Sequence, residues 1–240
     1  MCTVTIVPVK AGIYITSNRD EKRIRKAALP PRTYKHKHSA ITYPKDADAG
    51  GTWIAMKDNG DAAVLLNGGL KKHIAALPYR KSRGLIFLDV FEEAPVAAFK
   101  NILLDNIEPF TLVLFINGSL LECRWDGTKK YIKPLQAIVP HIWSSVTLYD
   151  DEVIRKREEW FAKWLTQNPA PAIEDVLSFH RFGGDGDERN DLRMNRDGIY
   201  NTVSITAIEL TEDNNTMHYL DLKSNQSFTK QIGTGSYITA

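Results

Sequence analysis

Residues 1–21 read MCTVTIVPVKAGIYITSNRDE, and this stretch carries most of the information about the fold. β-Branched residues dominate its first part and alternate as in a strand. The odd-numbered residues from Thr3 to Val7 fall on one face, and the even-numbered residues from Val4 to Pro8 fall on the other. Residues 10–12, Lys-Ala-Gly, read as a turn. The pattern predicts a β-hairpin whose second strand brings residues 17–21, Ser-Asn-Arg-Asp-Glu, to its end beside the N-terminus.

Beyond this hairpin, strands follow strands and helices follow helices. Residues 22–48 are polar, contain Pro30 and Pro31, and are expected to form a loop. This order does not match the regular alternation of a parallel βαβ fold, and it predicts an α+β fold in which helices cover antiparallel sheets, as one domain over residues 1–240. We expect strands at 52–57, 62–66, 110–116, 120–125, 131–135 and near 200–209, 217–222 and 227–232, and helices within 81–106 (broken at Pro95), 150–166 and 173–182.

Composition and charge exclude several classes of function. Of 240 residues, 43% are hydrophobic and 25% charged, and the net charge of +2 gives no reason to expect nucleic acid or an anionic membrane as a partner. No apolar run approaches the ~20 residues of a membrane span, and the N-terminus does not resemble a secretory signal. The two cysteines, Cys2 and Cys123, are too few for a disulfide scaffold, so we expect a cytoplasmic protein. Cys123 is expected to be a packed core residue.

Position 2 carries the chemical signal. Methionine is generally removed before a small residue, so the mature chain is expected to begin with Cys2, which then bears a thiol and a free α-amine. Their ordinary pKa values are about 8.5 and 7.7–8.0, so the amine can accept the thiol proton near neutral pH. This is how an N-terminal amine activates a nucleophile without a separate histidine. The alternative is a small residue at a terminus with no chemical role.

Other ingredients of such a site are present in the chain. The charged residues 19–21 lie close to Cys2 if the hairpin is correct, and Asn67 ends another predicted hairpin just before two glycines. A cation would stabilise a thiolate, a carboxylate would hold the α-ammonium, and an amide would donate to an oxyanion. Taken singly, an Arg-Asp pair is more often a solvated loop pair, and Asn-Gly is more often a turn.

Four ordered motifs together resemble a known family. Met-Cys opens the first strand, Asn-Arg-Asp-Glu occupies residues 18–21, Gly-Gly-Thr-Trp occupies residues 50–53, and Asn67 closes a later strand. This order resembles the NRDE family, also called the transport and Golgi organization protein 2 family. That family is similar to the N-terminal cysteine hydrolases that include penicillin V acylase and bile salt hydrolase. The resemblance implies an αββα sandwich of two antiparallel sheets between helical layers, and cleavage of a non-peptide linear amide.

The resemblance also implies roles for individual residues. Ser144 stands where the acylases carry a second oxyanion asparagine, and Arg155 matches a later family motif, although a surface arginine on an amphipathic helix is the simpler interpretation. The stretch from Ile199 to Ile208, which includes Asn-Thr-Val at 201–203, resembles the family's late core strand. By the same resemblance, Cys2 would be the nucleophile and Arg19 its charge partner. Asp20 or Glu21 would anchor the α-amine, and Asn67 would be an oxyanion donor.

Two functions follow as hypotheses. The first is an amidohydrolase that forms a thioester on Cys2 and acts on a small acylated amine or amide, with no cofactor and no metal. His36, His38 and Asp46 lack the spacing of a tight metal site. The second is a binding or carrier protein for haem or another hydrophobic ligand, related to trafficking, which the apparent loss of the second oxyanion asparagine favours. Oligomeric state is left open.

Overall fold

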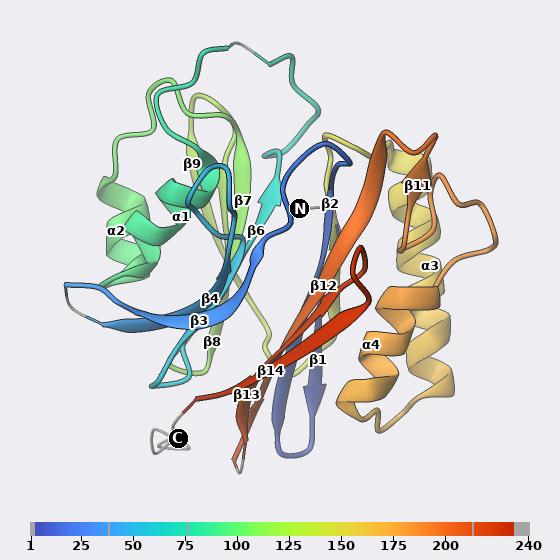
Figure 1. Ribbon diagram of the computed structural model, residues 1–240. Helices are drawn as coiled ribbons and strands as arrows, with labels where there is room; N and C mark the ends of the chain where they lie inside the picture. The colour runs from blue at the N-terminus through green and yellow to red at the C-terminus, as the bar shows by residue number, and fades with distance from the viewer. Residues whose placement is uncertain (1–2, 38, 76, 213, 233–240) are drawn as a thin grey trace.

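Two antiparallel sheets lie face to face, and a pair of helices covers the outer face of each (Figure 1). This computed structural model describes residues 3–37, 39–75, 77–212 and 214–232. The predicted α+β fold is confirmed, and so is the αββα order of layers implied by the resemblance. One face of each sheet packs on the common core, and the other face packs against helices. Apolar side chains on both faces of a central strand are therefore buried.

The first sheet contains the N-terminal hairpin. Its strand order is β10-β1-β2-β12-β13-β14, and β11 pairs with β12. The predicted hairpin is confirmed, but its second strand is longer than expected. It continues through the Asn-Arg-Asp-Glu motif because β12 pairs with it as far as Lys22. The strands are β1 (Thr3–Val9), β2 (Gly12–Lys22), β10 (His141–Ser144), β11 (Asn195–Arg196), β12 (Tyr200–Thr211), β13 (Asn215–Asp221) and β14 (Gln226–Gln231).

The second sheet runs in simple sequence order from β3 to β9. The loop predicted over residues 22–48 is wrong, because β3 and β4 form there. Both prolines lie in β3, an edge strand, and the register is interrupted between Leu29 and Arg32, so no ladder bond needs a proline N–H. The strands are β3 (Leu29–Lys35), β4 (Ala40–Lys45), β5 (Ile54–Lys57), β6 (Ala62–Asn67), β7 (Phe110–Ile116), β8 (Ser119–Trp125) and β9 (Lys130–Leu135).

The helices form the outer layers. They are α1 (Arg83–Phe91), α2 (Pro95–Asn101), α3 (Asp151–Gln167) and α4 (Ile173–Phe182), and the predicted break at Pro95 is confirmed. The main core lies between the sheets and extends under α1 and α2, while a second cluster joins α3 and α4 to β1 and β2 through residues such as Val7, Phe161 and Phe179. Cys123 is fully buried, as predicted. Among the described residues, no helix is long and apolar enough to cross a membrane.

Candidate active site

Residues of the predicted site meet at a pocket of about 540 Å³ where the two sheets approach each other. Arg19 and Glu21 reach it from β2, and Trp53 and Asn67 reach it from the second sheet. The Asn-Arg-Asp-Glu motif, the Gly-Gly-Thr-Trp motif and Asn67 therefore contribute to one cavity. Its other lining residues are Arg25, Asp46, Ala49, Gly51, Thr52, Leu65, Leu77, Pro78, Tyr79, Lys81, Ser82, Arg83, Gly84 and Glu108.

Arg19 is held on the inter-sheet face of β2. Its side chain is 4% exposed, its Nη2 lies 2.5 Å from Oδ2 of Asp46 and 3.7 Å from Oε2 of Glu21, and its guanidinium lies over the Trp53 ring at 4.7 Å. Asp46 also bonds Arg25 and the amides of Asp48 and Ala49. Burial alone raises the pKa of Asp46, but the Ala49 amide and the two guanidiniums outweigh it and lower that pKa. Arg19 is thus a fixed cation with an ionised partner.

The Gly-Gly-Thr-Trp motif explains how Trp53 comes to lie under Arg19. Gly51 packs on the start of α1, where a Cβ would stand 2.4 Å from the carbonyl carbon of Gly84. Next to it, the Thr52 hydroxyl donates to the Pro44 carbonyl at 2.7 Å, and the Thr52 amide donates to the Gly84 carbonyl. These contacts fix the chain just before β5, and the Trp53 carbonyl accepts from the Leu65 amide at 2.8 Å, so the backbone that carries the Trp53 ring is held in place.

Asp20 points the other way, toward α3 and α4. Its Oδ2 accepts from the Tyr149 hydroxyl at 2.7 Å, its Oδ1 accepts from the Thr202 hydroxyl at 2.6 Å, and the residue is 3% exposed. Thr202 belongs to the Asn-Thr-Val stretch of β12, the strand that the sequence pattern predicted there. Successive side chains of a strand leave opposite faces, which separates Asp20 from the pocket side of Arg19 and Glu21.

A buried polar network lies behind β1 on the same face as Asp20. Arg157 is fully buried, and its Nη1 donates to Thr3 Oγ1 at 2.5 Å. The rest of its guanidinium donates to the carbonyls of Asn190 and Asp191, and the group lies 3.6 Å over the Tyr149 ring. Sequence reasoning missed Arg157, although its spacing of four from both Val153 and Phe161 places it on the apolar face of α3.

His180 completes this network in its neutral form. Asn18 donates from Nδ2 to the carbonyls of His180 and Leu192, so its Oδ1 must accept from His180 Nδ1 at 2.6 Å. His180 Nε2 then accepts from the Thr5 hydroxyl at 2.7 Å. Burial, and then repulsion from Arg157, lower the pKa of His180 to about 3. The network holds the start of β1 against β2 without adding another charge.

Asn67 and Ser144 lie near one another at the end of the pocket. Both line a narrow adjoining space, and Ser144 pairs with Thr3 across β10 and β1. Among the described residues, none forms a hydrogen bond with the side-chain amide of Asn67, whereas the backbone carbonyl of Asn67 accepts from the Ser145 hydroxyl at 2.9 Å. Gly68 follows with φ +88, where a Cβ would stand 2.6 Å from Val146, so only glycine fits this turn. An anchored backbone with an open amide suits a hydrogen-bond donor.

Besides Asp20 and Ser144, two further predicted site residues are not among those that line this pocket. Cys2 lies outside the described residues, and Thr3 is the first described residue of β1. Arg155 is on the exposed face of α3 with its side chain 69% exposed, 3.8 Å from Glu159, and it does not line the pocket. The simpler interpretation of Arg155, a surface arginine, agrees with this position. Within the part of the chain that is described, no group of three or more His, Cys, Asp or Glu side chains is arranged to hold a metal ion.

Solved structures with a similar architecture include N-terminal nucleophile hydrolases. The Caenorhabditis elegans ortholog of N-acylethanolamine-hydrolyzing acid amidase matches with a TM-score of 0.60 and 14% identity over 86% of this chain and 92% of that one. Two variants of conjugated bile acid hydrolase from Clostridium perfringens match with TM-scores of 0.61 and 0.58 and identities of 13% and 12%. They cover 97% and 100% of this chain and 92% and 99% of theirs. At these identities the likeness establishes the fold alone.

Sequence comparison defines the family more narrowly. No individually curated protein matches the chain. The family described as Transport and Golgi organisation 2 matches residues 1–121, half of the chain, and this span contains the four ordered motifs Met-Cys, Asn-Arg-Asp-Glu, Gly-Gly-Thr-Trp and Asn67. The chain therefore belongs to the Transport and Golgi organisation 2 family, the NRDE family, and has the fold of the N-terminal nucleophile hydrolases.

Proposed function

We propose that this protein is an N-terminal cysteine amidohydrolase that cleaves the C–N bond of a small acylated amine through a thioester on Cys2. The observation that carries the proposal is the convergence of Arg19 and Asn67, from different sheets, on one pocket beside the start of β1. The β1–β2 register pairs Thr3 with Asn18. Arg19 follows Asn18 in β2 and therefore lies beside the N-terminal end of the described part of β1. The proposal includes a cytoplasmic location, which rests on the low cysteine content.

The chemistry follows from these positions. The α-amine takes the thiol proton, and the thiolate attacks the amide carbon, so that a C–S bond forms. The oxyanion of the tetrahedral intermediate accepts from the Asn67 amide, with the Ser144 hydroxyl as a second donor. Collapse breaks the C–N bond, and the leaving amine receives the proton from the α-ammonium. Water then attacks the thioester, releases the acid and restores the thiol.

Arg19 and Asp20 are proposed to support the reaction from opposite faces of β2. Arg19 stabilises the thiolate from the pocket side, and its bond to Asp46 holds the guanidinium in place. Asp20 anchors the α-ammonium from behind, with its carboxylate fixed by Tyr149 and Thr202. Glu21 lines the pocket and is proposed to contact the substrate. A cavity of about 540 Å³ suits a small molecule rather than a folded protein substrate.

The test is an intact mass measured before and after brief iodoacetamide treatment. The chain contains its own control, because burial, and then the nearby Glu122 charge, raise the pKa of Cys123 to about 12. Loss of Met1, followed by fast addition of one carbamidomethyl group that Cys2→Ala abolishes, is the expected result. A retained methionine, or a Cys2 no more reactive than an ordinary thiol, would overturn the mechanism. Hydrolysis of acyl amides by the wild type, absent in Cys2→Ala, would then identify the substrate.

A carrier for a hydrophobic ligand is the second candidate. It is favoured by Leu77, which lines the pocket and is 79% exposed, and by Ile74 on the same segment, which is 95% exposed. Such apolar exposure at a pocket rim is a feature of ligand sites. No histidine or cysteine is among the described lining residues, so haem ligation from this pocket gains no support. Stoichiometric ligand binding that survives Cys2→Ala, together with a retained Met1, would establish the carrier role in place of hydrolysis.

A further inference from the structure

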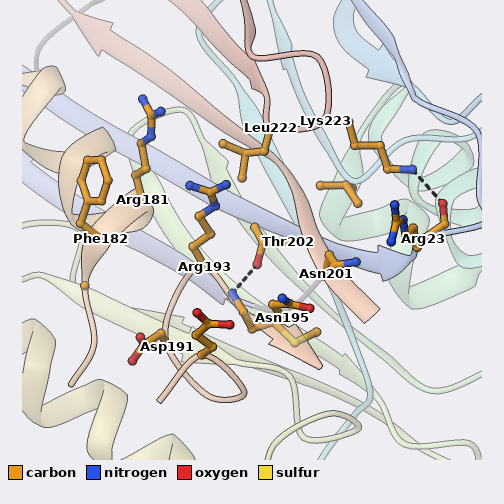
Figure 2. Close-up of a pocket in the computed structure, with 14 residues that line it drawn as sticks. Arg23, Arg181, Phe182, Asp191, Arg193, Asn195, Asn201, Thr202, Leu222 and Lys223 are labelled. Atoms are coloured by element: carbon orange, nitrogen blue, oxygen red, sulfur yellow. Dashed lines mark hydrogen bonds between the residues drawn. The ribbon is translucent and has the colours of Figure 1, made fainter. Parts of the chain in front are cut away.

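A second and larger pocket, of about 800 Å³, lies on another part of the molecule and shares no lining residue with the candidate active site. It is bounded by the end of α4, the loop that follows, the start of β12 and the turn after β13 (Figure 2). Thr202 contributes to its wall, and the hydroxyl of this residue is already committed to Asp20. The proposed hydrolysis makes no use of this cavity.

Positive charge gathers around this pocket. Arg181 and Arg193 lie on one side in Figure 2, and Arg23 and Lys223 lie on the other. Arg23, Arg181 and Arg193 form no ion pair with any described residue. Lys223 donates to the backbone carbonyls of Arg23 and Arg25, at 3.1 and 2.9 Å, and so remains an uncompensated cation. Four cations without an anionic partner around one cavity are expected to attract an anion.

The acidic residues in the lining do not cancel this charge. Only Glu188 and Asp191 carry carboxylates there. Asp191 is turned toward its own loop, where Oδ1 accepts from the Asp185 amide at 3.0 Å and packs closely against Gly184. Glu188 is exposed at the rim. With four cations and two carboxylates in its lining, the pocket retains a net positive charge.

Arg181 supplies an independent observation. Its Nε is buried and has no hydrogen-bond partner among the described residues, although the side chain borders an open cavity. Buried donors in native proteins are normally paired, and an unpaired one calls for an explanation such as a missing ligand. A guanidinium offers a planar fork that matches the oxygens of a phosphate or carboxylate. The Nη atoms of Arg181 also form no hydrogen bond or ion pair with any described residue, so the guanidinium can donate to an anion in the cavity.

The rest of the lining indicates what else the ligand carries. Phe182 is 69% exposed at the edge of the pocket, and its ring lies 5.2 Å from the Arg181 guanidinium. Met194, Val203 and Leu222 add apolar surface, and the amides of Asn195 and Asn201 add donors and acceptors. We propose that this pocket binds a small organic molecule that carries a phosphate group, with the phosphate on Arg181 and Arg193 and the apolar part against Phe182. The volume lies within the ~300–1,000 Å³ range of small-molecule sites.

Phenyl phosphate is a suitable probe, because it combines a dianion with an aromatic ring. Isothermal titration calorimetry at constant ionic strength is expected to give one site, and Arg181→Gln and Arg193→Gln are each expected to weaken binding at least about fivefold. Phe182→Ala is expected to reduce the affinity to that of inorganic phosphate. The matched control is Arg155→Gln, which removes an equal charge from the exposed face of α3 and is expected to change nothing.

Failure of this proposal is distinguishable from failure of the hydrolase proposal. Phenyl phosphate is not an amide, so the Cys2→Ala variant is expected to bind it as the wild type does. Heat no greater than that of potassium chloride at equal ionic strength would overturn the proposal. Unchanged binding by the Arg181→Gln/Arg193→Gln double variant would also overturn it, with unchanged thermal unfolding showing that the variant is folded. Loss of binding in Cys2→Ala would place the probe in the other pocket and count equally against the proposal.

Discussion

Arg19 and Asp20 are consecutive in β2, yet their side chains lie on opposite faces of the sheet and in different networks. Arg19 bonds Asp46 at 2.5 Å in the pocket between the sheets, and Asp20 accepts from Tyr149 at 2.7 Å on the helical side. A cation and a carboxylate that could have neutralised each other are thereby kept apart. In the proposed mechanism, Arg19 acts on the start of β1 from the pocket and Asp20 acts on it from behind.

Removal of the Arg19 cation tests its proposed role directly. Arg19→Gln is expected to raise the thiol pKa of Cys2 by about 1 unit, because the thiolate loses a nearby positive charge. The effect is at the low end of the usual range since Asp46 and Glu21 already offset part of that charge. Iodoacetamide alkylation at pH 7 is then expected to slow several-fold, and a pH–rate profile measures the shift. Arg25→Gln, a more exposed arginine on the same carboxylate, is the control; an equal shift in both variants would contradict the assignment.

The anchoring of Asp20 can be tested through stability. Tyr149→Phe keeps the ring under Arg157 but removes a donor to a buried carboxylate, so a loss of about 1.5–3 kcal/mol is expected. Tyr131→Phe also removes a hydroxyl bond to an aspartate, Asp126, but on the surface, where less than about 0.5 kcal/mol is expected. Urea unfolding of the two variants measures the difference. Equal midpoints would mean that Asp20 does not depend on Tyr149.

Two arginines on α3 provide a matched pair. Arg157→Ala leaves the Thr3 hydroxyl and two loop carbonyls without their charged donor, so destabilisation of about 3 kcal/mol or more is expected. Arg155→Ala removes a side chain that is 69% exposed, and a change below about 0.5 kcal/mol is expected. Chemical denaturation measures both. Similar losses in the two variants would show that the buried network contributes little.

His180 makes stability depend on pH. Its folded pKa of about 3 lies below the ordinary 6.5, so below pH 6.5 the unfolded chain binds a proton that the folded chain does not. This contribution to stability is complete above pH 6.5. It is lost as the pH falls toward 3, at up to about 1.4 kcal/mol per pH unit. His180→Gln removes the titrating ring, so its difference in unfolding free energy from the wild type is expected to shrink over this range. A constant difference between pH 6.5 and 4 would show that His180 does not titrate in this way.

Local pattern was sufficient for most of the secondary structure. The alternation in residues 3–8, the Asn-Gly turn before β6 and the apolar face of α3 each reflect short-range constraints, and each predicted element formed there. The misses have identifiable causes. β10 has only four residues, too few to show a period, and β3 is an edge strand whose two prolines read as a loop. Both strands exist because a neighbouring strand pairs with them.

In the candidate site, too, some residues were predicted from the sequence pattern and others were not. Arg19, Glu21 and Asn67 were predicted and do meet in one pocket, whereas Asp46, Tyr149 and Arg157 were not recognised as parts of the site. No local sequence pattern marks Asp46, because it becomes the partner of Arg19 only when the chain folds back past that residue. Arg157 and His180 did carry a signal, since each occupies an apolar position of its helix. A buried charged or polar residue at such a position requires partners.

By itself, the sequence determined the chemical inventory and the order of the elements. It placed a cysteine at position 2 and brought residues 18–21 to the end of the second strand of the N-terminal hairpin, where alternation sends consecutive side chains to opposite faces. Only the tertiary structure decided that Asn67 would approach Arg19 from the other sheet and that Tyr149 and Thr202 would close on Asp20. The physical reason is range: periodicity records which face of an element is buried, whereas contacts between distant segments arise only when the two sheets and their helices pack together.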